Sequence, residues 1–328
     1  MDHARVLQTV LDAAGPESAR IGRLWWLMLS VGTVVYVAVI VWAVLAYLRG
    51  RRHRAADRGS SRERPPVEAS SDHTMHIVVA GATGATVVIL LGLLVASVWT
   101  NRGVASLGAS SAVTINLTGH QWWWEAEYES ATPSERFKTA NELHIPVGRP
   151  VVLKVTSTDV IHSLWIPNLQ GKRDLIPGYT TAIWLQADRP GLYRGQCAEF
   201  CGMQHAHMAL YVTAESDDAF EKWRAGQIKP AVQPESEETR LGRDVFLHAT
   251  CTQCHTIRGT IAGATLGPDL THLAARGTLA AGTLPNRRGH LAGWIADPQQ
   301  IKPGARMPPN SVQSEDLQRL LAYLETLK

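Results

Sequence analysis

The chain has 328 residues, a formal net charge of +3 and 19% charged residues. This length allows two domains or more, and the modest charge content excludes a disordered or nucleic-acid-coating polymer. Its four cysteines are too few for a small scaffold held together by disulfides. The apolar residues are concentrated in two early blocks, and the rest is typical of soluble protein.

Two early segments are long enough to cross a membrane. Residues 24–48 and 77–100 contain no Asp, Glu, Lys or Arg, and each run exceeds the roughly 20 apolar residues that a transmembrane helix needs. Gly81, Gly84 and Gly92 in the second run suit close packing between helices. A cleaved signal peptide is the alternative for the first run, but its apolar core is too long for one.

The segment between these runs, residues 49–72, is basic. The positive-inside rule places this loop in the cytoplasm. Both the N-terminus and everything after Arg102 then lie on the periplasmic or outer side of the inner (plasma) membrane. Nucleic-acid binding is the alternative, but the orientation role already explains the charges, so we expect membrane lipid and no nucleic acid as a partner. The arginines are Arg49, Arg51, Arg52, Arg54, Arg58, Arg62 and Arg64.

Short β-type runs begin at Val113 and continue to about Val212. Pro-Gly turn signals separate them, and this spacing predicts an all-β sandwich or barrel. The runs that we expect as strands are Val113–Thr118, Val151–Thr156, Thr181–Leu185 and Ala209–Thr213.

Soft metal ligands cluster near the end of this β region, in Cys197-Ala-Glu-Phe-Cys201-Gly-Met-Gln-His205-Ala-His207-Met208. Copper sites combine thiolate, imidazole and thioether ligands. Two thiolates on one loop can bridge two copper ions, each with a terminal imidazole. The second imidazole must come from elsewhere, and His162 is the candidate. A disulfide is the alternative for a CxxxC pair outside the cell.

A second motif, Cys251-Thr-Gln-Cys254-His255, follows further along the chain. In an exported chain, CxxCH indicates covalent attachment of a c-type haem. Each thiol can reach one vinyl group of the porphyrin, and the histidine then faces the iron. The two motifs use all four cysteines, which leaves none for a disulfide.

The sixth iron ligand has several candidates. Met307 stands in Pro303-Gly-Ala-Arg-Met307-Pro-Pro, which suits a rigid loop across a haem face. We favour Met307 because a Met/His pair raises the potential of a cytochrome c. The histidine alternatives are His248, His272 and His290. We interpret the last two as surface residues or neighbours of the haem propionates. Leucines at helical spacing predict a final helix that Ser314 caps.

Together these motifs resemble subunit II of the haem–copper oxidases, which carries the dinuclear copper centre CuA. The resemblance covers about residues 24–213, and the segment from about Gly242 to Leu327 resembles a class I cytochrome c. Such a fusion is typical of caa-type oxidases. The matching motifs are Gly119-His-Gln-Trp-Trp-Trp124, Asp159-Val-Ile-His162-Ser, Asp174-Leu-Ile-Pro-Gly178 and Cys197 through Met208.

The resemblance implies a role for each ligand of a two-copper site. Met203 competes with Met208 but lies too close to Cys201 for the family spacing. His207 matches no ligand position, so we interpret it as a surface or neighbouring residue. The implied set is two bridging thiolates, two terminal imidazoles, a weak thioether and a backbone carbonyl: Cys197, Cys201, His162, His205, Met208 and Glu199.

Two further roles follow from the resemblance. The Glu199 carboxylate is implied as a ligand of a magnesium ion at the junction with the catalytic subunit. Trp122 is implied as the electron-entry residue near the copper site. On a strand, alternation would place Trp122 and Trp124 on one face and Trp123 on the other.

By resemblance, the chain is a multi-domain membrane protein. Residues 1–102 form a two-helix transmembrane hairpin, residues 103–215 an all-β cupredoxin-like sandwich that holds CuA, residues 216–238 a linker, and residues 239–328 an all-α class I cytochrome c domain. The implied function is electron entry into a terminal respiratory oxidase. Electrons pass from an external donor through covalent haem c and CuA to the subunit that reduces oxygen to water.

The implied partners are subunit I and a subunit III, with a cytochrome c or a quinol-oxidising complex as donor. The enzymatic alternative is the electron-entry subunit of a CuA-type nitric oxide reductase. The non-enzymatic alternative is a membrane-anchored copper or haem carrier. His76 departs from the family pattern, because many members have a glutamate there that serves a proton channel. A proton-loading role for His76 is a hypothesis, and an ordinary interfacial residue is the alternative.

Overall fold

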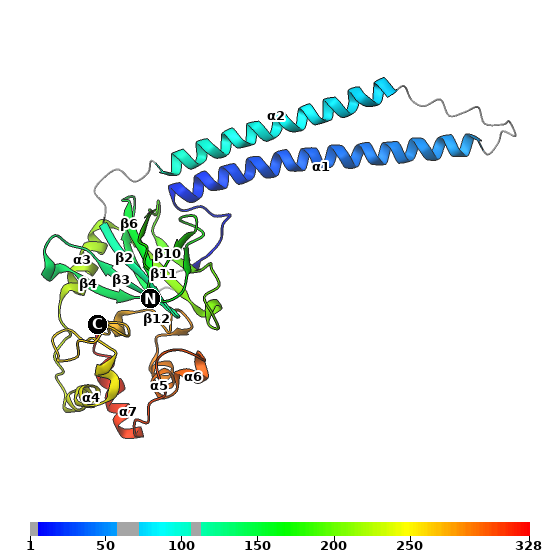
Figure 1. Cartoon of the computed structure of the whole chain (residues 1–328). Helices are drawn as coiled ribbons and strands as arrows, with labels where there is room; N and C mark the ends of the chain where they lie inside the picture. The colour runs from blue at the N-terminus through cyan, green and yellow to red at the C-terminus, as the bar shows by residue number, and fades with distance from the viewer. Residues whose placement is uncertain (1–5, 58–71, 106–112) are drawn as a thin grey trace. The chain divides into compact units, whose positions relative to one another are not determined.

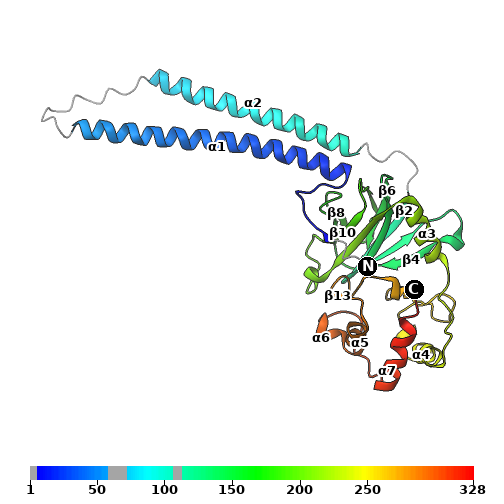
Figure 2. The same cartoon turned by 180° about the vertical axis from the view of Figure 1, so that it is seen from behind.

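The computed structural model describes residues 6–57, 72–105 and 113–328, which Figures 1 and 2 show from opposite sides. They fall into two compact units. One is a helical unit, Arg20–Ser106, and the other combines Met1–Ala19 with Leu107–Lys328. The second unit contains both predicted metal-binding regions.

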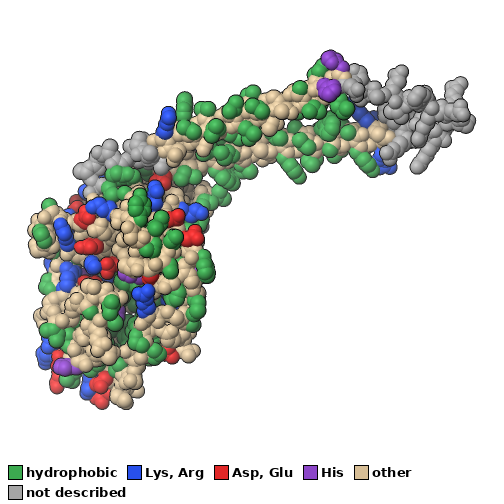
Figure 3. Space-filling view, viewed as in Figure 1, with side chains coloured by type: hydrophobic (Ala, Val, Ile, Leu, Met, Phe, Trp, Pro, Cys, Tyr) green, Lys and Arg blue, Asp and Glu red, His purple; other side chains and the backbone are tan. Residues whose placement is uncertain are grey.

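Two long helices, α1 (Pro16–Asp57) and α2 (Asp72–Ala105), dominate the first unit. Their apolar stretches Pro16–Arg52 and His73–Gly103 are long enough to cross a bilayer. Hydrophobic side chains cover the visible face of both helices in Figure 3. Helices that are apolar without a protein core around them suit lipid, so the predicted pair of apolar helices is confirmed.

Helix α1 continues past Leu48, where the first span was expected to end. Arg49, Arg51, Arg52 and Arg54 therefore lie in its last turns rather than in a loop, because arginine is a good helix former. Arg58, Arg62 and Arg64 lie outside the described residues. The three glycines expected to support helix packing, Gly81, Gly84 and Gly92, have no neighbour within 4 Å of an added Cβ among the described residues.

The second unit begins with a sandwich of two sheets (Figure 1). One sheet orders β5 (Glu142–Pro146), β11 (Ala209–Glu215), β10 (Gly191–Cys197), β7 (His162–Trp165) and β8 (Arg173–Leu175). The other orders β4 (Phe137–Ala140), β3 (Trp123–Tyr128), β2 (Val113–His120), β6 (Val151–Ser157) and β9 (Thr181–Leu185). All four predicted strands are present. Burial alternates along β2, β3, β6 and β10, as two facing sheets require.

The core between the sheets is rich in aromatic residues. Trp124, Tyr128 and Tyr193 are among the largest fully buried side chains. Helix α3 (Asp217–Ile228) begins after Ser216, whose hydroxyl accepts from Ala219 N at 3.3 Å. Phe220 of this helix belongs to the sandwich core. The charges and prolines of residues 216–238 predict a short helix or turn followed by a linker, and α3 is that helix, packed on the sandwich.

An N-terminal segment is also part of the sandwich. Strand β1 (Val6–Leu7) pairs in parallel with β10. Further along, Ala14 N donates to Asn168 O and Asp188 N donates to Ala14 O, both at 2.7 Å. Gly15 is so close to the sandwich that an added Cβ would lie 2.3 Å from Gln186 O. Sequence reasoning missed this pairing, because two strand residues carry no periodic signal.

The C-terminal part is mainly helical. Its core forms where α4 and α7 cross, with Phe246, Leu320 and Tyr323 buried. Ser314 is the first residue of α7 rather than its cap, and Gln313 takes the cap position. The elements are α4 (Glu237–His248), η4 (Thr250–Gln253), η5 (Leu273–Ala275), β12 (Thr278–Leu279), β13 (Leu284–Pro285), α5 (Arg288–Ala296), α6 (Pro298–Ile301) and α7 (Ser314–Leu324).

Gly242 makes this helix crossing testable. A Cβ there would lie 1.9 Å from Arg319 O of α7, so we expect Gly242→Ala to lower the unfolding free energy by about 1–3 kcal/mol. Calorimetry of the haem-loaded full chain would measure it. Gly226→Ala in α3 is the control, because an added Cβ there has no neighbour within 4 Å. An unchanged melting temperature in Gly242→Ala would contradict the close crossing.

Candidate metal centres

The structure brings His162 to the two cysteines of the predicted copper loop. Cys197 ends β10, Cys201 follows in the loop before β11, and His162 begins β7. Ligand atoms of these three buried residues all lie within 4.8 Å of one another. Cys197 Sγ is 3.9 Å from His162 Nδ1, and Cys201 Sγ is 3.6 Å from His205 Nδ1. Each sulfur therefore has an imidazole nitrogen beside it, and both cysteines are free thiols.

The loop also separates the two competing methionines. Met208 is fully buried, with its sulfur 3.9 Å from Cys201 Sγ, whereas Met203 is 71% exposed. The carbonyl oxygen of Glu199 lies 3.2 Å from Cys197 Sγ, while the Glu199 residue is exposed. His207 is exposed, and its Nδ1 lies 2.8 Å from Gln204 Oε1. The geometry thus favours Met208 over Met203 as the thioether.

Asp159 orients the imidazole of His162. Its Oδ1 lies 2.9 Å from His162 Nε2, which leaves Nδ1 facing Cys197. Burial raises the pKa of Asp159, but hydrogen bonds from His162 and from Gln121 N outweigh burial and keep the pKa below its ordinary value. Gly119 leaves space for the ring, because an added Cβ would lie 2.7 Å from His162 Cδ2. Such carboxylate–histidine pairs fix the tautomer and ring orientation of metal ligands.

The two thiols titrate as a pair. A hydrogen bond from the Cys201 thiol lowers the pKa of Cys197, and the resulting thiolate raises the pKa of Cys201. Metal binding would release the remaining proton, because thiolates rather than thiols are the ligands. Buried thiolate, imidazole and thioether donors form the set that copper prefers, so these residues fit copper.

We expected Trp122 on a strand, but it lies in the turn between β2 and β3. Its indole donates to Cys201 O at 2.9 Å, and the residue is 9% exposed. Trp124 is fully buried, and Trp123 stacks on His120 with ring centroids 4.3 Å apart. Trp122 and Trp124 are thus buried and Trp123 is partly exposed, which agrees with the expected placement of Trp122 and Trp124 on one face and Trp123 on the other.

The haem motif lies at the short helix η4. Cys251 and Cys254 are not joined in a disulfide. His255 Nδ1 donates to the carbonyl of Pro268 at 2.8 Å, which leaves Nε2 available to iron. Burial lowers the pKa of His255 and so favours the neutral, ligating form. Gly267 packs on this ring, since an added Cβ would lie 2.8 Å from Cε1. These residues fit a covalent haem.

Met307 lies in a loop that Gln299 holds. The Gln299 side chain donates to Ala305 O at 2.7 Å and to Met307 O at 2.8 Å. Of the two positions expected for His272, the surface position is wrong, because the residue is 7% exposed and backbone carbonyls contact both ring nitrogens. A place beside the haem propionates stays a prediction. His248 and His290 each direct Nδ1 to a backbone carbonyl.

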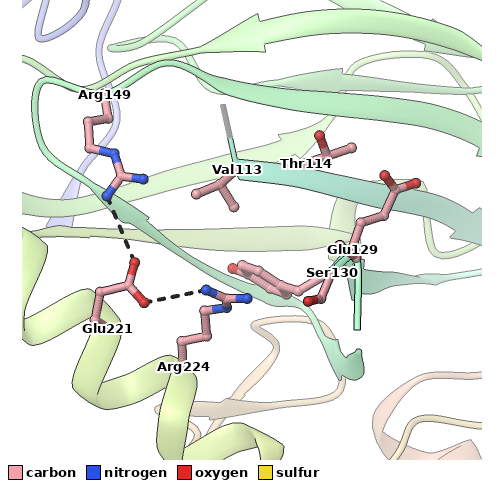
Figure 4. Close-up of a pocket in the computed structure, with 9 residues that line it drawn as sticks. Val113, Thr114, Glu129, Ser130, Arg149, Glu221 and Arg224 are labelled. Atoms are coloured by element: carbon pink, nitrogen blue, oxygen red, sulfur yellow. Dashed lines mark hydrogen bonds and ion pairs between the residues drawn. The ribbon is translucent and has the colours of Figure 1, made fainter. Parts of the chain in front are cut away.

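A cavity of about 540 Å³ lies away from both predicted sites (Figure 4). Arg149 and Arg224 line it, and both pair with Glu221, at 3.8 Å and 3.4 Å. It contains none of the predicted ligands. Because its arginines already have a carboxylate partner, we assign no ligand to it.

Comparison with known proteins gives matches to both metal-binding regions. Residues 113–215 match the family "Cytochrome C oxidase subunit II, periplasmic domain", and residues 239–328 match the family "Cytochrome c". Cytochrome c oxidase subunit 2 of Alkalihalophilus pseudofirmus is 32% identical over 98% of this chain and 91% of that protein. The subunit 2 of Bacillus sp. (strain PS3) is 29% identical over 80% of this chain and 77% of that protein.

Among solved structures, the periplasmic domain of cytochrome oxidase subunit II from Bradyrhizobium japonicum matches with 30% identity and a TM-score of 0.34. The matched region covers 36% of this chain and 95% of the Bradyrhizobium japonicum domain.

The fold, the sites and the comparisons define a membrane-anchored electron-transfer protein with copper and haem c. The chain belongs to the cytochrome c oxidase subunit II family, with a cytochrome c domain at its C-terminal end. It is the electron-entry subunit of a terminal oxidase and associates with other oxidase subunits.

Asp159→Asn tests the orientation of His162. We expect copper retention to weaken by about 10–100-fold, because loss of a carboxylate behind a ligating histidine has this effect. Copper per chain would be measured against increasing chelator. Asp188→Asn is the control, since Asp188 is exposed and contacts Gln186 rather than a predicted ligand. Wild-type retention in Asp159→Asn would refute the orienting role.

Proposed function

We propose that this chain takes electrons from an external donor at its haem c domain and passes them through a dinuclear copper site to a catalytic subunit I. Subunit I then reduces oxygen to water. The observation that carries this proposal is the convergence of the loop before Met307, the Trp122 turn and the copper loop in one compact unit. Both redox sites thus belong to one protein body.

The proposed copper site uses donors from two segments, the start of β7 and the loop between β10 and β11. Cys197 and Cys201 would bridge two ions, His162 and His205 would be terminal ligands, and Met208 and the Glu199 carbonyl would complete the set. Two copper ions that share thiolates spread one electron over both metals, so little rearrangement accompanies a change of oxidation state. The rigid sandwich around the cluster would preserve that geometry, since its strands are buried on their inner faces.

The exposed Glu199 side chain points to a second role. We propose that its carboxylate binds magnesium at the junction with subunit I, because oxygen ligands suit this hard cation. The carbonyl and the carboxylate of one residue would then contact two different metal sites.

The proposed haem site uses Cys251 and Cys254 as thioether links and His255 and Met307 as the axial pair. Haem c supplies one-electron transfer at a potential that Met/His ligation raises. The Pro268 carbonyl holds His255 in one tautomer, and Gln299 holds the backbone beside Met307.

Trp122 receives a modified role in this proposal. It is 9% exposed, and Gly304 of the C-terminal part lies against its ring: an added Cβ at Gly304 would be 3.4 Å from Cη2. A separate donor protein therefore has little access to the indole. We propose that Trp122 takes electrons from the chain's own haem domain, while external donors contact that domain.

The topology supports a location for both redox sites on one side of the membrane. Strand β1 precedes the two membrane helices yet pairs with β10, which follows them. An even number of crossings is required for this pairing. With the arginine-rich segment in the cytoplasm, the sandwich and haem domain would be periplasmic. The further proposed partners are subunit III, membrane lipid, and either a cytochrome c or a quinol-oxidising complex as donor. We also propose that the membrane hairpin ends at residue 102, the sandwich at residue 215 and the linker at residue 238.

Spectroscopy of the assembled oxidase tests the proposal. We expect wild type to show copper hyperfine structure from two equivalent ions, beside a low-spin c-type haem, and to consume oxygen with a reduced donor. Cys201→Ser removes a bridging thiolate, so we expect loss of this copper signal and of nearly all oxygen consumption, with the haem spectrum unchanged. Electron paramagnetic resonance, visible spectra and an oxygen electrode provide these readouts.

Two outcomes would contradict the proposed function. A mononuclear copper signal in wild type would exclude the bridged pair. Consumption of nitric oxide rather than oxygen would assign the chain to a nitric oxide reductase. Met203→Leu is the matched control for the copper loop, because Met203 is exposed and its sulfur is not among the proposed ligands.

A further inference from the structure

Lys302 is a buried cation between the sandwich and the C-terminal part. It follows α6 and is 2% exposed. Its Nζ donates to Trp122 O at 2.8 Å, His207 O at 2.8 Å and Ala280 O at 3.0 Å. An ammonium has three donors, so all are used. Burying such a group is costly unless its donors are satisfied, and here three neutral carbonyls satisfy them.

The first two carbonyls belong to segments that contact the copper cluster. Trp122 O is in the turn whose indole donates to Cys201 O. His207 O immediately precedes Met208, whose sulfur lies 3.9 Å from Cys201 Sγ. Ala280 belongs instead to the C-terminal part, in the turn between β12 and β13. One ammonium therefore connects the two segments around the copper cluster to the haem domain.

The residues that follow Lys302 continue the same contact. Gln204 of the copper loop donates to Pro303 O at 2.8 Å. Gly304 lies against the Trp122 ring. Arg306 lies 3.2 Å from Asp159, the carboxylate that orients His162. The next residue is Met307, so the loop that supplies the proposed iron ligand is held on the copper site along its length.

A role in stability alone does not account for a cation here. Burial lowers the pKa of Lys302 to about 7, because desolvation disfavours the charged form. An apolar side chain of similar length would fill the space without that desolvation. An apolar side chain would make no directional contacts, whereas the three hydrogen bonds of the ammonium fix three backbone segments relative to one another.

We propose that Lys302 is a positioning residue that holds the Met307 loop on the Trp122 turn and thereby sets the rate of electron transfer between haem c and copper. The inference rests on the proposed function. Electron transfer weakens steeply with separation, so a small displacement of this loop changes the rate. Lys302 itself carries no electron and binds no metal.

The test measures electron transfer from haem c to copper in the assembled oxidase after rapid photoreduction of the haem. Copper oxidation state is followed in the near infrared, at mildly acidic pH, which favours the ammonium form of Lys302. We expect Lys302→Met and Lys302→Gln to slow the transfer severalfold, because the rate falls steeply as the haem and copper sites move apart. Lys302→Arg, which keeps a cationic donor, should recover most of the rate.

Lys222→Met is the matched control. Lys222 is exposed on α3 and distant in sequence from the contact, so we expect the wild-type rate. The haem spectrum and the copper resonance of each variant show whether both sites are intact. The proposal therefore predicts slow transfer between two spectroscopically normal sites.

Two results would overturn the positioning role. One is a wild-type transfer rate in Lys302→Met or Lys302→Gln with both sites intact. The other is loss of copper or haem in both variants, which would make Lys302 a purely structural residue. If wild type itself shows no transfer from haem c to copper, it is the proposed function that fails, so the two failures are distinct.

Discussion

The structure depends on one constraint: two thiols, two imidazoles and a thioether must meet in a buried space. Two separate segments supply them, the start of β7 and the loop from Cys197 to Met208, and strands fix both. Strand β10 ends at Cys197, β11 begins just after Met208, and β7 begins at His162. Two thiolates side by side repel each other, so without a metal one of the two cysteines keeps its proton. The aromatic core of the sandwich supplies the rigidity that holds them together.

The surroundings of the cluster connect this constraint to electron transfer. Asp159 orients His162 through one oxygen and contacts Arg306 of the C-terminal part through the other. Trp122 contacts the Cys201 carbonyl through its ring and Lys302 through its own carbonyl. The residues that shape the copper site are thus also the residues that hold the haem domain. Ligand geometry and domain docking share one set of contacts.

Much of the site could be predicted from the sequence, because ligand chemistry is local. The spacing of the CxxxC motif with its nearby His and Met, and of the CxxCH motif, is enough to indicate copper and haem. Strands β2, β6, β9 and β11 follow from the residue preferences of their segments. The missed features depend on distant contacts. The turn position of Trp122, the burial of His272 and the contacts of Lys302 are set by segments remote in sequence. Residues 49–57 were expected in a loop because they are polar and mostly charged, yet they continue helix α1.

The pairing of the N-terminal segment with β10 also bears on how the chain is made. Gln8 bonds to Gln196, which lies 188 residues later. At a synthesis rate of about 5–20 residues per second, the first strand waits roughly 10–40 s for its partner to be translated. Both apolar helices are translated within that interval, because they lie between the two strands in the chain. The N-terminal strand can therefore join the sandwich only after the segment that contains both apolar helices has been made.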